Sequence, residues 1–301
     1  VNLADRYDAD GVTARLAMMT PENARIWYIS PNEPHNKTAY FVDAPYQVDK
    51  ISAQTFADWQ KKAGEIALKL PELNPYIPDD FSLTKTNQDY PHPALIVDEP
   101  TLRVVYTPSR YFASEPKADV SVVLRNPKAM NSAKNQVMFA LNDYLAGIAL
   151  DQLSNQAAVG GISFSTNANN GLMLNANGYT QRLPQLFQAL LEGYFSYTPT
   201  EEQLEQAKSW YAQMMDSAEK GKAYDQALMP AQMLSQIPYF QREERRALLP
   251  SISLKEVLAY RDALKTNTRP EFLIVGNMSE EQAKTLAENV RTQLGSKGDE
   301  W

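Results

Sequence analysis

Asp119-Val120-Ser121-Val122-Val123-Leu124 and the residues that follow Ser132 decide the fold of this chain. The six-residue stretch alternates polar and apolar side chains as a half-buried strand does. Ser132 is a good helix N-cap, and the segment after it repeats apolar residues at helical spacing until Gly160-Gly161 ends it. Its apolar positions are Val137, Leu141, Leu145, Ile148 and Leu153. A strand with one buried face beside a long helix predicts a sheet covered by helices.

The surrounding residues extend this unit in both directions. Residues 102–107 predict a strand, and 162–166 with 172–176 predict a hairpin around Asn169-Asn170-Gly171, because Asn-Gly suits turn positions with positive φ. Further along the chain, the patterns predict helices at about 183–195, 200–219, 223–236 and 253–264. They also predict a strand at 272–275 and a final helix that Ser279 caps. We therefore predict an α+β fold with an antiparallel or mixed sheet and helices on one face.

The N-terminal third of the chain has a different character. Residues 24–30 predict a strand rich in β-branched and aromatic side chains, and Ser52 caps a helix. Six prolines then fall between positions 71 and 100, and proline is excluded from long helices and central strands. We interpret this stretch as an extended linker between domains. The predicted units are a partial domain at 1–70, a linker at 71–101 and a complete domain at 102–295.

No motif for catalysis or metal binding is visible in the sequence. There is no cysteine, and the two histidines, His35 and His92, lie beside prolines without a second ligand four residues away. Neither a phosphate loop nor a nucleophile elbow is present. The acidic residues Glu201, Glu202 and Glu205 fit the start of a helix better than a catalytic pair. We therefore predict no catalytic or metal-binding residue.

Composition excludes further classes of function. The formal net charge of −7, without a run of basic residues, disfavours nucleic acid as a partner. No apolar stretch reaches the roughly 18 residues of a membrane-spanning helix. The first residues are neither a signal peptide nor a start methionine, so we expect the chain to begin inside a longer protein or after processing.

Several runs of residues resemble the pitrilysin and insulin-degrading enzyme family of zinc metallopeptidases. They are LPELNPYIPDDF at 70–81, PHPALI at 91–96, NQVMFALNDYL at 135–145, Gly193-Tyr194 and VGNM at 275–278. The resemblance covers essentially the whole chain. It implies four similar α+β domains, arranged as two halves that enclose peptide substrates. It also implies that this chain runs from late in the second domain to the end of the third.

The same resemblance implies that zinc is bound elsewhere. The family holds zinc with H-x-x-E-H and a distant glutamate in the first domain, whereas the corresponding long helix here reads Asn142-Asp143-Tyr144-Leu145-Ala146. No catalytic or metal-binding residue is carried over to this chain, which we expect to be inactive alone. We expect zinc in the missing first domain, a periplasmic location, and the missing domains and peptide substrates as partners.

Our hypothesis from the sequence is that this chain supplies a wall of the substrate chamber and a hinge of the whole enzyme. Residues 102–295 would form part of the substrate-chamber wall and 71–101 the hinge, with Pro75 and Pro78 as hinge candidates or, alternatively, as parts of a plain surface strap. Two other functions stay open: a stand-alone module that binds peptides or partners, similar to inactive processing-peptidase subunits, and an unrelated hydrolase with a carboxylate site. Because the core partners of 1–70 would lie upstream, we also expect the chain to self-associate.

Overall fold

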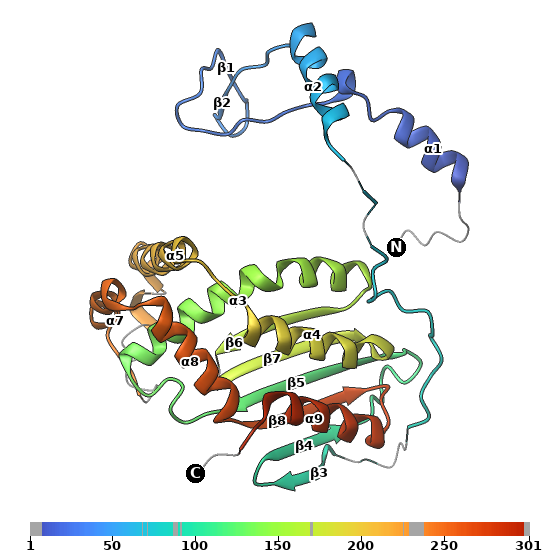
Figure 1. The fold of residues 1–301 in the computed structure, drawn as a ribbon, viewed down its shortest axis with the longest axis vertical. Coiled ribbons are helices and arrows are strands. Elements are labelled where there is room, and N and C mark those ends of the chain that lie inside the picture. The colour runs from blue at the N-terminus through green and yellow to red at the C-terminus, as the bar shows by residue number, and fades with distance from the viewer. Residues whose placement is uncertain are drawn as a thin grey trace. The chain divides into compact units, whose positions relative to one another are not determined.

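The structure is a computed structural model that describes residues 8–67, 69–70, 72–86, 90, 92–168, 171–224, 226–228 and 238–297. The chain forms two compact units, Val1–Glu72 and Leu73–Trp301. Figure 1 labels their helices and strands. The second unit contains the large sheet and most of the helices, so it positions the candidate site.

In its described residues, the first unit contains two helices, a short helical turn and a two-stranded ribbon. These are α1 (Ala9–Ala17), a 3₁₀ turn (Pro21–Asn23), β1 (Lys37–Thr38), β2 (Pro45–Tyr46) and α2 (Ala53–Glu65). Ser52 caps α2 as predicted, since its hydroxyl accepts the backbone N–H of Thr55 at 3.1 Å. None of the described side chains in this unit is buried.

The strand that we predicted over residues 24–30 is not formed. The segment is neither helix nor strand, and Trp27 and Ile29 are 80% and 93% exposed. A strand is stable only when a neighbour satisfies its backbone N–H and C=O groups. Among the described residues, β1 and β2 pair with each other and with no further strand. The prediction was wrong because residue composition gives a tendency to form a strand but does not supply the neighbouring strand.

The second unit is built on a six-stranded mixed sheet in the order β3-β4-β8-β5-β7-β6. Its strands are β3 (Ala94–Glu99), β4 (Leu102–Thr107), β5 (Lys117–Arg125), β6 (Ser163–Ala168), β7 (Gly171–Tyr179) and β8 (Arg269–Gly276). β4 and β8 run parallel, whereas the other neighbouring pairs are antiparallel. The predicted hairpin is confirmed as the β6–β7 pair, and Asn169 and Asn170 of its turn lie outside the described residues.

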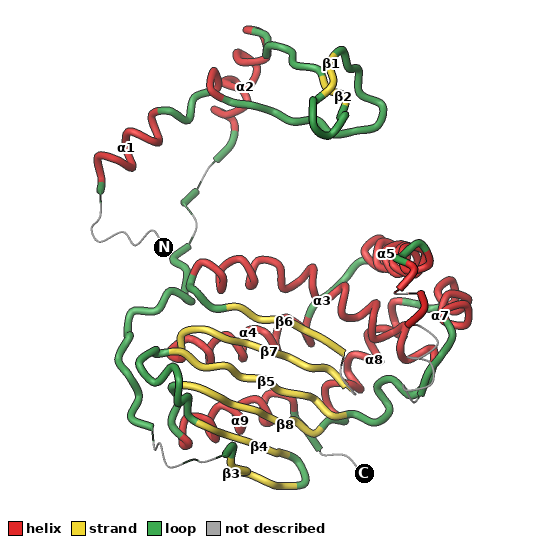
Figure 2. Tube along the Cα trace, turned by 180° about the vertical axis from the view of Figure 1, so that it is seen from behind, coloured by secondary structure: helices red, strands yellow, loops and turns green. Residues whose placement is uncertain are grey.

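Helices cover one face of this sheet, as Figure 1 and Figure 2 show from opposite sides. They are α3 (Ala133–Val159), α4 (Leu183–Ser196), α8 (Leu254–Thr266) and α9 (Glu280–Leu294), while α5 (Glu201–Glu219) and α7 (Arg242–Leu248) pack against α3. Two 3₁₀ turns, Thr180–Arg182 and Leu249–Ser251, complete the elements of this unit that the structure describes. The predicted α+β fold is confirmed; most of the helix predicted at 223–236 lies outside the described residues.

Capping residues fix where α3 and α5 begin. The hydroxyl of Ser132 accepts the backbone N–H of Asn135 at 3.1 Å, as the sequence predicted for the start of α3. At the start of α5, the Thr200 hydroxyl accepts the N–H of Gln203 at 3.2 Å, and the Gln203 side chain accepts the N–H of Thr200 at 2.9 Å. Glu202 follows in the first turn, where the positive end of the helix dipole stabilises a carboxylate.

Much of the proline-rich segment lies along the second unit as a strap, which we define as residues 73–86. Tyr76 is only 5% exposed and belongs to the hydrophobic core. The side-chain amide of Asn74 donates to a backbone carbonyl of α3 at 2.7 Å. Further along, the backbone N–H and C=O of Thr84 both bond to the side chain of Asn277, at 2.8 and 3.0 Å. The strap is therefore held by packing and hydrogen bonds, although it contains no helix or strand.

The range 71–101 thus holds more structure than an extended linker. The strap occupies its first half, and β3 occupies positions 94–99 as an edge strand paired with β4. Pro93 and Pro100 flank β3 on its two sides, which agrees with the confinement of proline to strand ends and edges. The use of this range as a hinge stays a prediction.

Candidate functional site

The middle of α3 carries a polar cluster around Asn142 and Asp143. Asn142 is fully buried, and its side-chain oxygen accepts a hydrogen bond from the Tyr197 hydroxyl at 2.7 Å. Asp143 accepts one from the Tyr194 hydroxyl at 3.1 Å. Tyr194 lies in α4 and Tyr197 directly follows it. The cluster therefore joins α3 to α4 by side-chain hydrogen bonds.

Burial governs the ionisation of this cluster. It raises the pKa of Asp143 above its ordinary value, and hydrogen bonds from Thr166 and Tyr194 offset part of that rise. Burial also raises the pKa of the Tyr194 and Tyr197 hydroxyls, and the nearby Asp143 carboxylate adds to both shifts. The Arg261 guanidinium, 5.1 Å from the centre of the Tyr197 ring, acts in the opposite direction. Both phenols are therefore protonated at neutral pH and serve as hydrogen-bond donors.

This cluster has the chemistry of a structural contact. It offers one carboxylate, Asp143, whereas a catalytic zinc site needs about three protein ligands. Across the described part of the chain, no three His, Cys, Asp or Glu side chains gather closely enough to hold a metal ion. His35 is exposed in the first unit, and His92 is exposed in the second unit just before β3. The described helices likewise include none that is long and apolar enough to cross a membrane.

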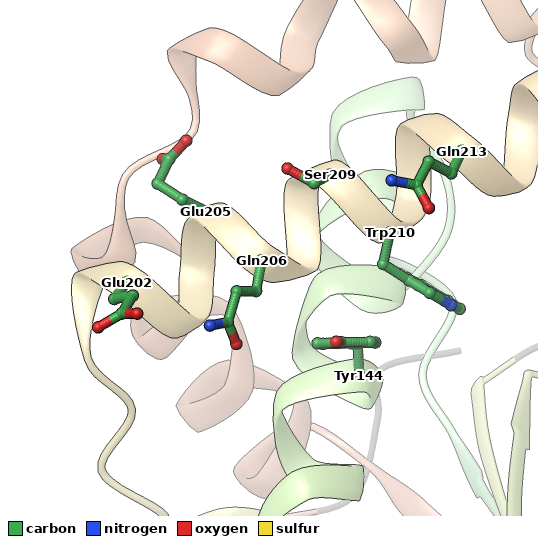
Figure 3. A pocket seen from close by; sticks show the side chains of 7 residues that line it. All are labelled: Tyr144, Glu202, Glu205, Gln206, Ser209, Trp210 and Gln213. Carbon is green, nitrogen blue, oxygen red and sulfur yellow. The ribbon is translucent and has the colours of Figure 1, made fainter. Parts of the chain in front are cut away.

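A shallow groove of about 470 Å³ lies between α3 and α5, and Figure 3 shows its side chains. We call it the α3–α5 groove. Its lining residues are Tyr144, Glu202, Glu205, Gln206, Ser209, Trp210 and Gln213. Tyr144 comes from α3 and directly follows Asp143, while the other six residues come from α5. The groove and the polar cluster therefore use adjacent residues of the same helix.

Two aromatic rings form one wall of the groove. The ring centres of Tyr144 and Trp210 lie 4.8 Å apart, with 32° between the ring planes. Trp210 is 39% exposed, so part of its ring surface is open to solvent. Glu202, Gln206 and Trp210 recur every four residues and share one face of α5, which Figure 3 shows turned toward Tyr144. The groove thus combines aromatic surface with a carboxylate and amides along one helix face.

Sequence patterns anticipated the acidic residues of this groove but not its aromatic wall. Glu202 lies in the first turn of α5, and Glu205 forms an ion pair with Lys208 at 2.8 Å, so both fit the predicted helix start. Tyr144 and Trp210 belong to different helices, and no local pattern links them. For Trp210, the sequence did contain a signal: its spacing of eight residues from Glu202 predicts that both lie on the same face of the helix.

The hinge candidates both lie on the strap. Pro75 is exposed and Pro78 is partly buried, on either side of the buried Tyr76. Next to them, the side-chain oxygen of Gln181 accepts the backbone N–H of Asp79 at 3.1 Å. The structure thus places both prolines on a segment that is anchored to the second unit.

Comparison with known proteins assigns the fold to a family. A family model described as the middle or third domain of peptidase_M16 matches residues 1–247. The chain belongs to the M16 peptidase family. The resemblance to pitrilysin-type proteins that we inferred from the sequence is thereby confirmed.

The similar proteins include peptidases of known name. This chain is 82% identical over 301 residues to Protease 3 of Escherichia coli (strain K12) and to Protease 3 of Shigella flexneri, a match that covers 100% of the chain and 31% of each relative. The crystal structure of pitrilysin matches with a TM-score of 0.84 and 82% identity, over 100% of this chain and 32% of that one. Insulin-degrading enzyme of Drosophila melanogaster is 24% identical over 312 residues. The chain therefore spans about a third of the length of these relatives.

Proposed function

We propose that this chain is a non-catalytic part of a zinc metalloendopeptidase and forms a wall of its substrate chamber. The observation that carries the proposal is the chemistry of α3 at Asn142, Asp143 and Tyr144. These side chains contact α4 and α5, and they offer one carboxylate where a zinc site needs about three ligands. A supporting role within a peptidase of the M16 family fits this set of side chains.

In this proposal zinc and the catalytic residues belong to the first domain of the whole enzyme, outside this chain. When bound there, zinc would supply Lewis-acid chemistry for the scissile carbonyl and the attacking water. The contribution of this chain is geometric, because its helices and sheet supply a rigid surface that limits where a peptide can lie. Its partners are the other domains of the enzyme and the peptide, and its location is the periplasm.

We also propose that residues 71–101 control how the two halves of the enzyme open. Pro75 and Pro78 restrict the backbone because proline fixes φ. The contacts of Asn74 and Tyr76 hold this part of the range against the second unit. A hinge motion would therefore pivot before Asn74, and the two prolines would stiffen the anchored side of the pivot.

Metal content and peptide cleavage of the 301-residue chain test its lack of catalysis. We expect no stoichiometric zinc and no chelator-sensitive cleavage of a fluorogenic peptide, since no set of three ligands gathers among the described residues. Full-length Protease 3 of Escherichia coli, assayed beside it, is the positive control. Bound zinc together with chelator-sensitive cleavage by this chain alone would overturn the proposal.

A chimera tests the wall and the hinge. This chain replaces the matching residues of Protease 3, to which it is 82% identical, and the double variant Pro75→Ala, Pro78→Ala is compared with Pro127→Ala. Pro127 is an exposed proline in the loop between β5 and α3, so it controls for the loss of proline itself. We expect only the double variant to change the ratio of turnover between long and short peptides.

Two results would contradict this assignment. The same turnover ratio in the chimera and all its variants would contradict the proposed role of residues 71–101 as a hinge. Full peptidase activity of Protease 3 after deletion of the matching residues would contradict the proposed wall role. That second result would favour a separate peptide- or partner-binding module.

A further inference from the structure

The α3–α5 groove has the side chains of a site for an organic cation. Its seven lining residues include two glutamates and two aromatic rings, and none of them is lysine or arginine. Glu205 is 68% exposed and already pairs with Lys208. Glu202 has no ion-pair partner within the described part of the chain. The groove therefore holds an unneutralised carboxylate beside an aromatic surface.

The aromatic wall favours a cation that carries an apolar stem. The partly exposed face of Trp210 can attract a cation through its ring quadrupole, and the ring of Tyr144 extends the same surface. The stems of lysine and arginine side chains pack along apolar surface while their charged ends reach polar groups. Gln206 lies between Glu202 and Trp210 on the same helix face and supplies an amide oxygen as a further acceptor.

We propose that the α3–α5 groove binds a lysine or arginine side chain of a peptide, with its apolar stem along the rings of Tyr144 and Trp210 and its charged end directed toward the Glu202 carboxylate. The inference deepens the proposed function and rests on it, because a chamber wall meets peptide segments. A volume of about 470 Å³ accommodates one long side chain and its neighbours.

Side chains of other chemistry fit this groove less well. An acidic side chain would be repelled by Glu202 and Glu205. An apolar side chain would cover the Glu202 carboxylate without giving it a partner, and the loss of hydration of that charge is unfavourable. The charge of the groove thus distinguishes basic peptides from neutral and acidic ones.

The test uses ¹⁹F NMR of the 301-residue chain labelled with 5-fluorotryptophan. The chain has four tryptophans, and the variant Trp210→Phe identifies the signal of Trp210. The probes are two acetylated ten-residue peptides of alanine and glycine, one with a central arginine and the other with citrulline, its neutral analogue. We expect the arginine peptide to shift the Trp210 signal with about two- to fivefold higher affinity, the range for one exposed charge contact with an aromatic or carboxylate group.

A matched pair of glutamate variants locates the effect. Glu281 occupies the second position of α9, which begins with the same kind of capping box as α5, so Glu281→Gln removes an equivalent first-turn charge away from the groove. We expect Glu202→Gln to abolish the preference for arginine and Glu281→Gln to preserve it. Far-UV circular dichroism and urea unfolding of each variant report whether it keeps its fold.

Equal affinities for the arginine and citrulline peptides in the unmodified chain would overturn the proposal. An equal loss of preference in Glu281→Gln would also overturn it, because the attraction would then come from overall charge. This binding assay is independent of peptidase activity. Failure here would remove the basic-side-chain site and leave the wall role to be judged by the chimera.

Discussion

Replacement of Gly160 by alanine is expected to disturb the strap where Tyr76 lies against the end of α3. Gly160 follows the last turn of α3 and has φ of −77°, which every residue adopts, so alanine does not strain the backbone of position 160 itself. A Cβ at this position would press against the carbonyl oxygen of Tyr76 and lie 2.7 Å from the carbonyl carbon. Both are backbone atoms and cannot rotate away. Either the end of α3 or the strap must therefore shift.

The variant can respond to this clash in two ways, and the less costly one sets the loss of stability. If the strap stays in place, the strain costs about 1–3 kcal/mol, as overpacking usually does. Release of the strap exposes the Tyr76 ring, which costs about 1.5–3 kcal/mol, and breaks the hydrogen bond from Asn74, which costs about 1 kcal/mol more. The chain adopts the less costly of these states. We therefore expect the free energy of unfolding to fall by about 1–3 kcal/mol.

Urea unfolding followed by circular dichroism measures this loss, and Gly147→Ala provides the control. Gly147 lies inside the same helix, and an added Cβ there would meet nothing within 4 Å. Alanine at such a site stabilises a helix by about 0.5–1 kcal/mol. The two glycine-to-alanine changes in one helix should thus have opposite signs. Hydrogen exchange of the strap amides should accelerate in Gly160→Ala and stay unchanged in Gly147→Ala.

A stable Gly160→Ala variant with unchanged exchange in the strap would refute this reasoning. It would mean that the carbonyl of Tyr76 does not rest against the end of α3. The proposed pivot before Asn74 would then lose its physical basis, because that proposal requires the strap to be anchored there. The groove between α3 and α5 would be unaffected by such a result.

Three further expectations concern the polar cluster, the strap and the first unit. Burial raises the pKa of Asp143 in the folded state above the ordinary value of 3.8. The free energy of unfolding of the wild type should therefore fall as the pH rises from 3.8 through the folded-state pKa. Urea midpoints measured across that pH range should show this loss in the wild type but not in Asp143→Asn. Asn277→Ala leaves the N–H and C=O of Thr84 unpaired, and the free energy of unfolding should fall by about 1–3 kcal/mol in the same assay. Because Trp27 and Ile29 are largely exposed, the chain should self-associate with rising concentration in sedimentation velocity, and a monomer at high concentration would count against this.

Local signals were sufficient to predict most helices and strands of the second unit. The strand over 102–107 matches β4, and the caps at Ser132 and Ser279 mark the observed starts of α3 and α9. Such features depend on residues within one or two turns of each other, so a single sequence reports them well. The one-sided covering of the sheet follows from the same alternation of apolar residues, because the four central strands β4, β8, β5 and β7 carry the buried side chains.

Features that depend on distant partners were beyond the reach of local patterns. Edge strand β3 forms inside the proline-rich range because β4 lies beside it, and residues 24–30 form no strand because none lies beside them. The strap is fixed by contacts such as that of Thr84 with Asn277, which are far apart in the chain. A run of prolines excludes regular structure but does not distinguish a free linker from an anchored strap.

The three residues at the centre of α3 explain why the absence of a motif is informative here. Successive helix residues point about 100° apart, so Asn142, Asp143 and Tyr144 face different neighbours. Asn142 bonds to the tyrosine after α4, Asp143 to Tyr194 within α4, and Tyr144 stacks beside the tryptophan of α5. Metal ligands at these positions would have to give up those contacts, and the buried polar partners left behind would be destabilising. The contacts of these three residues therefore hold α3 against α4 and α5. Such fixed packing of helices is what the proposed wall role requires.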